Sequence, residues 1–155
     1  SQRLHIDVCT VSSFEKQPIM LRNHYQVDFG TSGLILYAES REEIVADKLL
    51  ALALRTNRVK HRDIWDIVWL NNQSVALKPS LVKRKLEERN LSDKFFCESL
   101  HERINSLRDT HDEFLFEIRR FLPAAAVEDT LRQPEYWTFV LSVLDNMNKV
   151  VSAGL

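Results

Sequence analysis

The sequence predicts an α+β protein that is mostly helical, with a small β-containing segment at the N-terminus and a helical bundle after it. Residues 3–11 alternate apolar and polar side chains and are rich in β-branched residues, which is typical of a half-buried strand. Residues 34–37 form a short apolar run of the kind found in buried strands. After Glu39, the apolar residues recur with the spacing of helices.

Two further signals complete the N-terminal segment. Residues 18–21 are expected to add a short second strand, and residues 30–33, with the sequence Gly-Thr-Ser-Gly, have the composition of a turn before the strand at 34–37.

The helices have recognisable start signals. Ser40 and Glu43 form a capping box at the start of a first helix that continues to Leu54. Ser92 and Pro134 stand where an N-cap and a first-turn proline belong. The other helices are expected at about 62–71, 79–90, 92–108, 111–122 and from 134 onward.

Composition excludes several classes of function. With 155 residues, the chain is one domain or a core with a helical extension, and its net charge of −1 favours no general attraction to nucleic acid or membrane. Three glycines leave little material for a Gly-rich phosphate loop. Cys9 and Cys97 stand far apart, which fits a reducing cytoplasm and not a thiol-ligated zinc site. No apolar run is long enough to span a membrane.

Lys48 is the most informative residue of the sequence. Its neighbours at helical spacing are Ile44, Val45, Ala51 and Leu52, so it lies on a face that should be buried. A buried ammonium is costly unless it meets an anion. Lys48 is therefore either a ligand-binding lysine, a snorkelling lysine or one half of a structural ion pair with an aspartate of the next helix. Arg55 continues the same stripe.

The segment from Arg55 to Arg62 holds four Lys/Arg residues and one His, with no acidic residue. Because it joins two helices, Arg58 and Arg62 are expected at their junction, where they could receive a triphosphate or an RNA backbone. A solvated loop is the alternative interpretation.

Asp63 and Asp66 are three residues apart and share a face at the start of the second helix. They could take part in catalysis, or they could only interact favourably with the helix dipole. Trp65 and Trp69 are typical of core or interface positions. Asp7, in the expected strand 3–11, is a candidate Mg²⁺ ligand, although a solvent-facing acid would produce the same pattern.

The stretch 39–52 (ESREEIVADKLLAL), followed by Arg55 and by 62–67 (RDIWDI), resembles the AbiEii/AbiGii family of nucleotidyltransferase-like toxins from abortive-infection and type IV toxin–antitoxin systems. The shared elements are an acidic helix start, an Ala-acid-Lys-Leu-x-Ala core, a downstream Arg and an Arg-Asp-x-aromatic-Asp helix. They cover residues 39–70; beyond about residue 75 the likeness is only helical character.

The resemblance implies a nucleotidyltransferase-like fold, with a short mixed sheet and a C-terminal helical bundle, divided here at about residue 75. It implies Mg²⁺-dependent transfer of a nucleotide from an NTP to tRNA or a protein. Lys48 and Arg55 match phosphate-binding positions, Asp63 and Asp66 match the last acidic motif, and Asp7 matches an acidic strand position. A cognate antitoxin is the implied partner, and the cytoplasm is the implied location.

The family's first motif, a Gly-Ser turn followed by Asp-x-Asp that binds the metals, is absent from the 155 residues. Because the chain starts at Ser1 without a methionine, we expect this motif upstream and expect residues 1–155 alone to be inactive. The alternative function is a non-enzymatic helical module that binds an antitoxin-like partner or RNA.

Overall fold

The computed structural model describes residues 11–22 and 30–155. The chain forms two compact units, Ser1–Ser40 and Arg41–Leu155, which are considered separately below. Residues 3–10 of the expected strand at 3–11, Asp7 among them, lie outside the described residues, and Val11 is not in a strand. The boundary expected at residue 75 lies within the second unit and stays a prediction.

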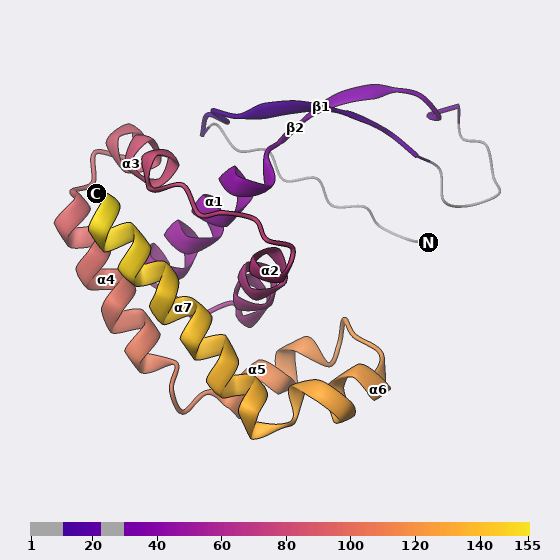
Figure 1. Cartoon of the computed structure of the whole chain (residues 1–155), viewed down its shortest axis with the longest axis vertical. Helices are drawn as coiled ribbons and strands as arrows, with labels where there is room; N and C mark the ends of the chain where they lie inside the picture. Colours follow the sequence, from indigo (N-terminus) through magenta and orange to yellow (C-terminus); the bar gives the residue numbers. More distant parts are fainter. Residues whose placement is uncertain (1–10, 23–29) are drawn as a thin grey trace. The chain divides into compact units, whose positions relative to one another are not determined.

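The first unit contains a β-hairpin, labelled in Figure 1. Strand β1 spans Lys16–Met20 and strand β2 spans Ile35–Glu39, so both expected strands in this part are confirmed, with shifts of one or two residues. The burial expected for residues 34–37 is wrong, because Ile35 is 60% and Tyr37 74% exposed. The strands pair antiparallel. The expected turn also forms: Gly33 has a φ of +83°, which favours glycine, and the amide of Leu34 bonds the carbonyl of Thr31.

The hydrogen-bond pattern of the hairpin places Pro18 on its outer edge. The Leu21 amide donates to Leu34 and the Ser40 amide donates to Glu15, which marks both as hydrogen-bonded pairs. Because such pairs alternate with non-hydrogen-bonded ones, the pair Pro18–Tyr37 is non-hydrogen-bonded. The missing N–H of Pro18 therefore faces away from β2, where a proline removes no bond within the hairpin.

The second unit is helical, and each helix expected from the sequence is present. Ser92 caps its helix by accepting a hydrogen bond from the amide of Phe95, and Pro134 occupies the first turn of the last helix. The helices are α1 Arg41–Leu54, α2 His61–Asn72, α3 Pro79–Glu88, α4 Asp93–Ser106, α5 His111–Ile118, α6 Ala124–Ala126 and α7 Pro134–Gly154, with a π-helical turn at Val127–Leu131.

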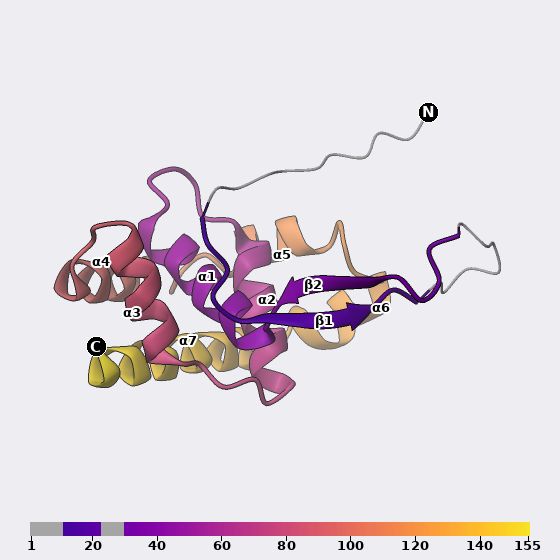
Figure 2. The same ribbon diagram turned by 90° about the horizontal axis from the view of Figure 1, so that it is seen from above.

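Helix α1 is central to this unit because α2, α3 and α4 all pack against it, while α7 packs against α2, α3 and α4 (Figures 1 and 2). The buried face of α1 includes Val45, Ala46 and Leu49, which are completely enclosed. Helix α5 packs against α2. The functional residues expected on α1 and α2 are therefore carried by helices whose apolar faces fix their relative position.

The fifth helix is shorter than expected: it ends at Ile118, and residues 119–121 form a turn. Pro123 disfavours helical geometry at Leu122, and the chain leaves the helix before reaching it. The short α6 and the π-helical turn that follow carry no periodic apolar pattern long enough to be recognised in the sequence.

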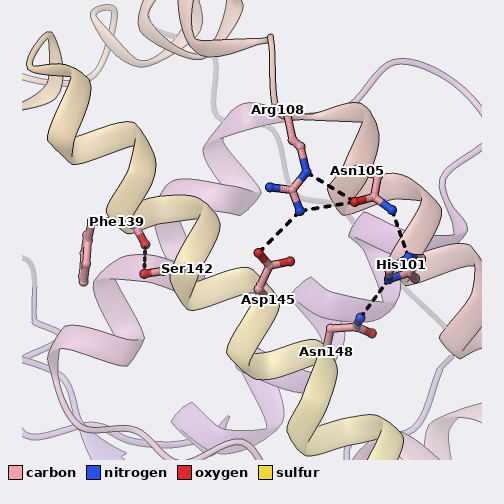
Figure 3. A network of polar contacts seen from close by, with 7 residues as sticks. All are labelled: His101, Asn105, Arg108, Phe139, Ser142, Asp145 and Asn148. Carbon is pink, nitrogen blue, oxygen red and sulfur yellow. Dashed lines mark hydrogen bonds and ion pairs between the residues drawn. The ribbon is translucent and has the colours of Figure 1, made fainter.

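A strip of polar contacts joins α4 to α7, as Figure 3 shows. Arg108, just after α4, bonds Asn105 Oδ1 at 3.3 Å and reaches Asp145 of α7 at 3.6 Å. His101 contacts Asn105 at 2.9 Å and Asn148 at 3.5 Å. These contacts lie at the rim of the α4–α7 interface, whose interior is apolar.

Within residues 11–22 and 30–155, no helix combines the length and the apolar composition that crossing a membrane requires.

Candidate functional site

Helices α1 and α2 bring four of the predicted site residues into one ion-pair cluster. Lys48 Nζ lies 2.7 Å from Asp63 Oδ1 and 2.6 Å from Asp66 Oδ2. Arg55 Nη2 lies 3.2 Å from Asp63 Oδ2. We call Lys48, Arg55, Asp63 and Asp66 the Lys48 cluster.

Helix geometry explains how the cluster assembles. Lys48 lies on α1 and Arg55 directly follows its last residue, with its amide still bonded to the carbonyl of Ala51, so the two lie on one stripe. Asp63 and Asp66 share a face on the first turns of α2. Packing of α1 against α2 sets the two stripes opposite each other. The ion pair that the sequence left open as a structural interpretation is thus present, and it includes both aspartates.

The cluster is buried at Asp63 and open at Asp66. The Asp63 side chain is 8% exposed, the Lys48 side chain 27% and the Asp66 side chain 43%. An ammonium group has three N–H donors, and the two aspartates account for two of them. Solvent or a ligand can therefore reach Lys48 from the side of Asp66.

Burial disfavours the charge on Lys48, but hydrogen bonds to Asp63 and Asp66 and the charges of both carboxylates outweigh it, so the pKa of Lys48 is raised. The lysine is consequently a permanent cation at physiological pH, suited to bind an anion and unsuited to act as a base.

Arg55 is held from two sides. Besides its bond to Asp63, its carbonyl accepts a hydrogen bond of 2.6 Å from Arg103 Nη2 of α4. Its Nη1 atom is buried and has no hydrogen-bond partner among the residues that the structure describes. Leaving a buried guanidinium donor without a partner costs free energy.

The aspartates of the cluster do not fit a Mg²⁺ ion. Lys48 and Arg55 occupy three of the four carboxylate oxygens of Asp63 and Asp66. Two-metal phosphoryl transfer needs carboxylates that are free to hold the ions. The metal ligands implied by the sequence resemblance must therefore lie outside this cluster.

Arg58 and Arg62 do not join the cluster through any ion pair among the described residues. Arg58 is exposed and its Nη2 lies 3.8 Å from Glu117 of α5. Arg62 is exposed and lines a pocket with Trp65 and Asp66. The basic segment thus faces α5 as well as the Lys48 cluster.

His61, the first residue of α2, lies beside a cavity of about 470 Å³ that includes Arg58, Phe116 and Glu117. Burial lowers the pKa of His61, although the charge of Glu117, 3.6 Å away, works in the opposite direction. Among the described residues, its buried Nε2 atom finds no hydrogen-bond partner.

Sequence reasoning missed a second lysine cluster. Lys85 of α3 lies 2.8 Å from Glu43 Oε1 and 2.9 Å from Asp47 Oδ2 on α1. Burial disfavours the charge on Lys85, but the hydrogen bonds and charges of Glu43 and Asp47 outweigh it and raise the pKa of Lys85. The signal was weaker than at Lys48, because only Leu81 and Val82 on the N-terminal side of Lys85 are apolar, whereas the neighbours at i+3 and i+4 are Glu88 and Arg89.

Residues 1–139 match the family described as nucleotidyl transferase AbiEii toxin, type IV TA system. The chain belongs to this family. No curated protein and no solved structure matches the chain.

Membership of the AbiEii family confirms the relationship inferred from the sequence, and the match includes every residue of the Lys48 cluster. Residues 3–11, including Asp7, also lie within the matched region.

Proposed function

We propose that this AbiEii-family toxin transfers a nucleotide from an NTP to tRNA or a protein, and that the Lys48 cluster binds the triphosphate. The observation that carries the proposal is a lysine ammonium that two carboxylates hold in place while it stays open to solvent. A fixed cation of this kind can stabilise charge on a phosphoryl group as the bond to its leaving group breaks.

Each member of the cluster has a distinct part in the proposal. Lys48 directs its third N–H to a phosphate oxygen, and Arg55 offers the Nη1 donor that has no partner in the cluster. Asp63 is a positioning residue, since its two oxygens hold Lys48 and Arg55. Asp66 holds Lys48 at the open side.

Arg58 and Arg62 extend the positive charge toward the remainder of the substrate, because both are exposed at the junction of α1 and α2. The attraction that they provide is electrostatic and depends on salt.

The Mg²⁺ ion belongs to the proposal as the metal that would neutralise the phosphates. Asp7 is its candidate ligand within these residues, together with the expected upstream Asp-x-Asp. Because the metal-binding first motif is absent from these residues and three of the four oxygens of Asp63 and Asp66 contact cations, we propose that residues 1–155 alone do not transfer nucleotides. A cognate antitoxin and a cytoplasmic location complete the proposal.

The second candidate function is a non-enzymatic helical module that binds an antitoxin-like partner or RNA. The observation that favours it is the neutral balance of the Lys48 cluster, in which two cations meet two carboxylates as they would in a purely structural network.

The test uses the full-length gene product with Mg²⁺, each α-labelled NTP and total cell RNA. We expect label to move to RNA or protein, and Lys48→Ala to reduce transfer at least a hundredfold. Lys94→Ala is the matched control, since Lys94 is an exposed lysine of α4 that forms a surface ion pair with Glu98 at 3.9 Å.

Folding of each variant is checked by circular dichroism. Full transfer activity in a folded Lys48→Ala variant would show that Lys48 does not bind the triphosphate. Absence of transfer from the unaltered protein with every metal and acceptor tried would favour the binding module.

A further inference from the structure

A pocket with aromatic walls lies between the first turns of α2 and the end of α5. Its volume is about 300 Å³, and its walls are Arg62, Trp65, Asp66, Ile118, Phe121 and Leu122. Asp66 belongs both to this pocket and to the Lys48 cluster, where its Oδ2 atom bonds Lys48 Nζ. The pocket therefore adjoins the groups proposed to hold the triphosphate.

The walls of the pocket suit a flat, aromatic ligand. Phe121 is 63% exposed, although it is one of the largest apolar side chains. Trp65 forms another wall and Arg62 adds a planar guanidinium. Nucleobases that are not paired in a helix stack on aromatic rings and on guanidinium groups. Stacking of a base would cover the ring of Phe121, which the described residues leave in water.

Basic residues occur on both elements that build this pocket. Arg58 and Lys60 precede α2, and Arg119 and Arg120 follow α5. Arg58 and Arg120 line a second cavity together with three acidic residues, Asp112, Glu113 and Glu117, which partly balance their charge there. The cations that can meet the phosphates of a strand are therefore chiefly Arg62, which lines the pocket itself, and the two arginines after α5.

Two arginines that follow α5 stack on the ring of Phe116. The guanidinium groups of Arg119 and Arg120 lie 4.5 Å and 4.9 Å from the centre of the Phe116 ring. Contacts of this kind hold cationic side chains against the surface of α5 and leave their outer faces to a phosphate or a base.

We propose that the pocket between α2 and α5 binds a base of single-stranded RNA, with the flanking arginines on the phosphates of the strand. The inference rests on the proposed function in one respect, because it names RNA and not protein as the acceptor. Binding itself needs no catalysis and is measured separately.

The experiment measures fluorescence anisotropy of a short, labelled single-stranded RNA of mixed sequence with the full-length protein over a range of salt. Phe121→Ala should weaken binding roughly tenfold or more through loss of one stacked base, and Phe121→Trp should retain it. Arg120→Ala should also lower the slope of log affinity against log salt by about 0.7.

Two variants serve as controls for these changes. Phe139→Ala removes a part-exposed ring of α7, and Lys94→Ala removes an exposed cation of α4. Both should bind RNA as the unaltered protein does. Equal affinity of Phe121→Ala and Phe139→Ala, or no binding of RNA at all, would overturn the proposal. Loss of label transfer to a protein acceptor in Phe121→Ala, with RNA binding unchanged, would overturn it in favour of protein docking.

Transfer assays with the same variants separate this inference from the proposed function. If Phe121→Ala weakens RNA binding while neither it nor the unaltered protein transfers a nucleotide, the pocket binds RNA and the proposed function is wrong. If transfer to RNA proceeds normally in Phe121→Ala, the proposed function is supported and the role of the pocket is wrong.

Discussion

Two lysines of the helical unit each lie between a pair of carboxylates, and they differ in their access to water. Lys48 meets Asp63 and Asp66 at 2.7 Å and 2.6 Å, and its side chain is 27% exposed. Lys85 meets Glu43 at 2.8 Å, and its side chain is 1% exposed. Helix α1 contributes the lysine to one cluster and the carboxylates to the other.

The comparison separates a structural role from a ligand-binding one. The distances are nearly equal, so neither the hydrogen bonds nor the raised pKa values distinguish the clusters. Only the open cluster can present an N–H donor to a phosphate. The enclosed Lys85 can do no more than join α3 to α1, since a buried charge stays only where its partners are fixed.

The largest effect on stability is expected from Lys85→Met. Removing the ammonium leaves Glu43, which is completely enclosed, without its cation. Breaking a buried ion pair from one side costs about 3–5 kcal/mol. Urea unfolding of the protein and of Lys85→Met measures this loss, with Lys85→Arg as a variant that keeps the charge. A loss below about 1 kcal/mol would show that the two clusters do not differ as their burial indicates.

Lys48→Met should cost less stability, about 1 kcal/mol, because Asp63 keeps Arg55 and Asp66 is open to water. The same urea experiment measures it. If the Lys48 variant loses nucleotide transfer but little unfolding free energy, Lys48 differs from Lys85, whose loss is expected to act on stability. A loss as large as that of Lys85→Met would make Lys48 a structural residue instead.

Alkaline pH should weaken both clusters. The pKa values of Lys48 and Lys85 are raised by folding, so their stabilisation is complete below the unfolded value of 10.5 and is lost as pH rises through the folded values. Burial raises the pKa of Tyr136 from 10.0 to about 12, and its contribution is lost from pH 10 upward for the same reason.

Thermal unfolding between pH 9 and 12, with Tyr136→Phe to remove the tyrosine contribution, isolates the lysines. The double variant Lys85→Met/Tyr136→Phe should show a shallower alkaline decline than Tyr136→Phe alone. An equal slope would mean that Lys85 does not contribute in this range.

The smallest effect is expected from Arg108→Ala, at the rim of the α4–α7 interface. Arg108 and Asp145 are 50% and 39% exposed and 3.6 Å apart. An exposed ion pair contributes below about 1 kcal/mol. Added salt should reduce the difference in unfolding free energy between Arg108→Ala and the unaltered protein. A larger, salt-independent loss would place this contact among the structural ones with Lys85.

The sequence carried enough information for the helices because their signals are local. Ser92 and Pro134 marked helix starts correctly, and the apolar periodicity of α1 and α2 placed both. Pro123 indicated that the fifth helix stops before it but not that it stops as early as Ile118, and no local pattern predicted the π-helical turn at Val127–Leu131. Those features depend on how the chain fits against neighbouring helices.

For the site, the sequence predicted which residues are on functional faces but not what they touch. Lys48 on an apolar face indicated a buried cation, and its two aspartates followed from the packing of α1 on α2. Lys85 carried a weaker signal, with apolar neighbours only at i−3 and i−4, and its partner Asp47 is 38 residues away and depends on how α3 packs against α1. The pocket at Phe121 required the crossing of α2 and α5, which no local spacing encodes.

Pro18 gives the hairpin two unequal edges. Since Pro18 and Tyr37 form a non-hydrogen-bonded pair, the backbone of each faces outward at that level, but only Tyr37 has an N–H to donate there. An additional strand can therefore match the donor and acceptor pattern of β2 and meets an interruption on β1. Any growth of this sheet, whether by folding or by aggregation, is directed to one side.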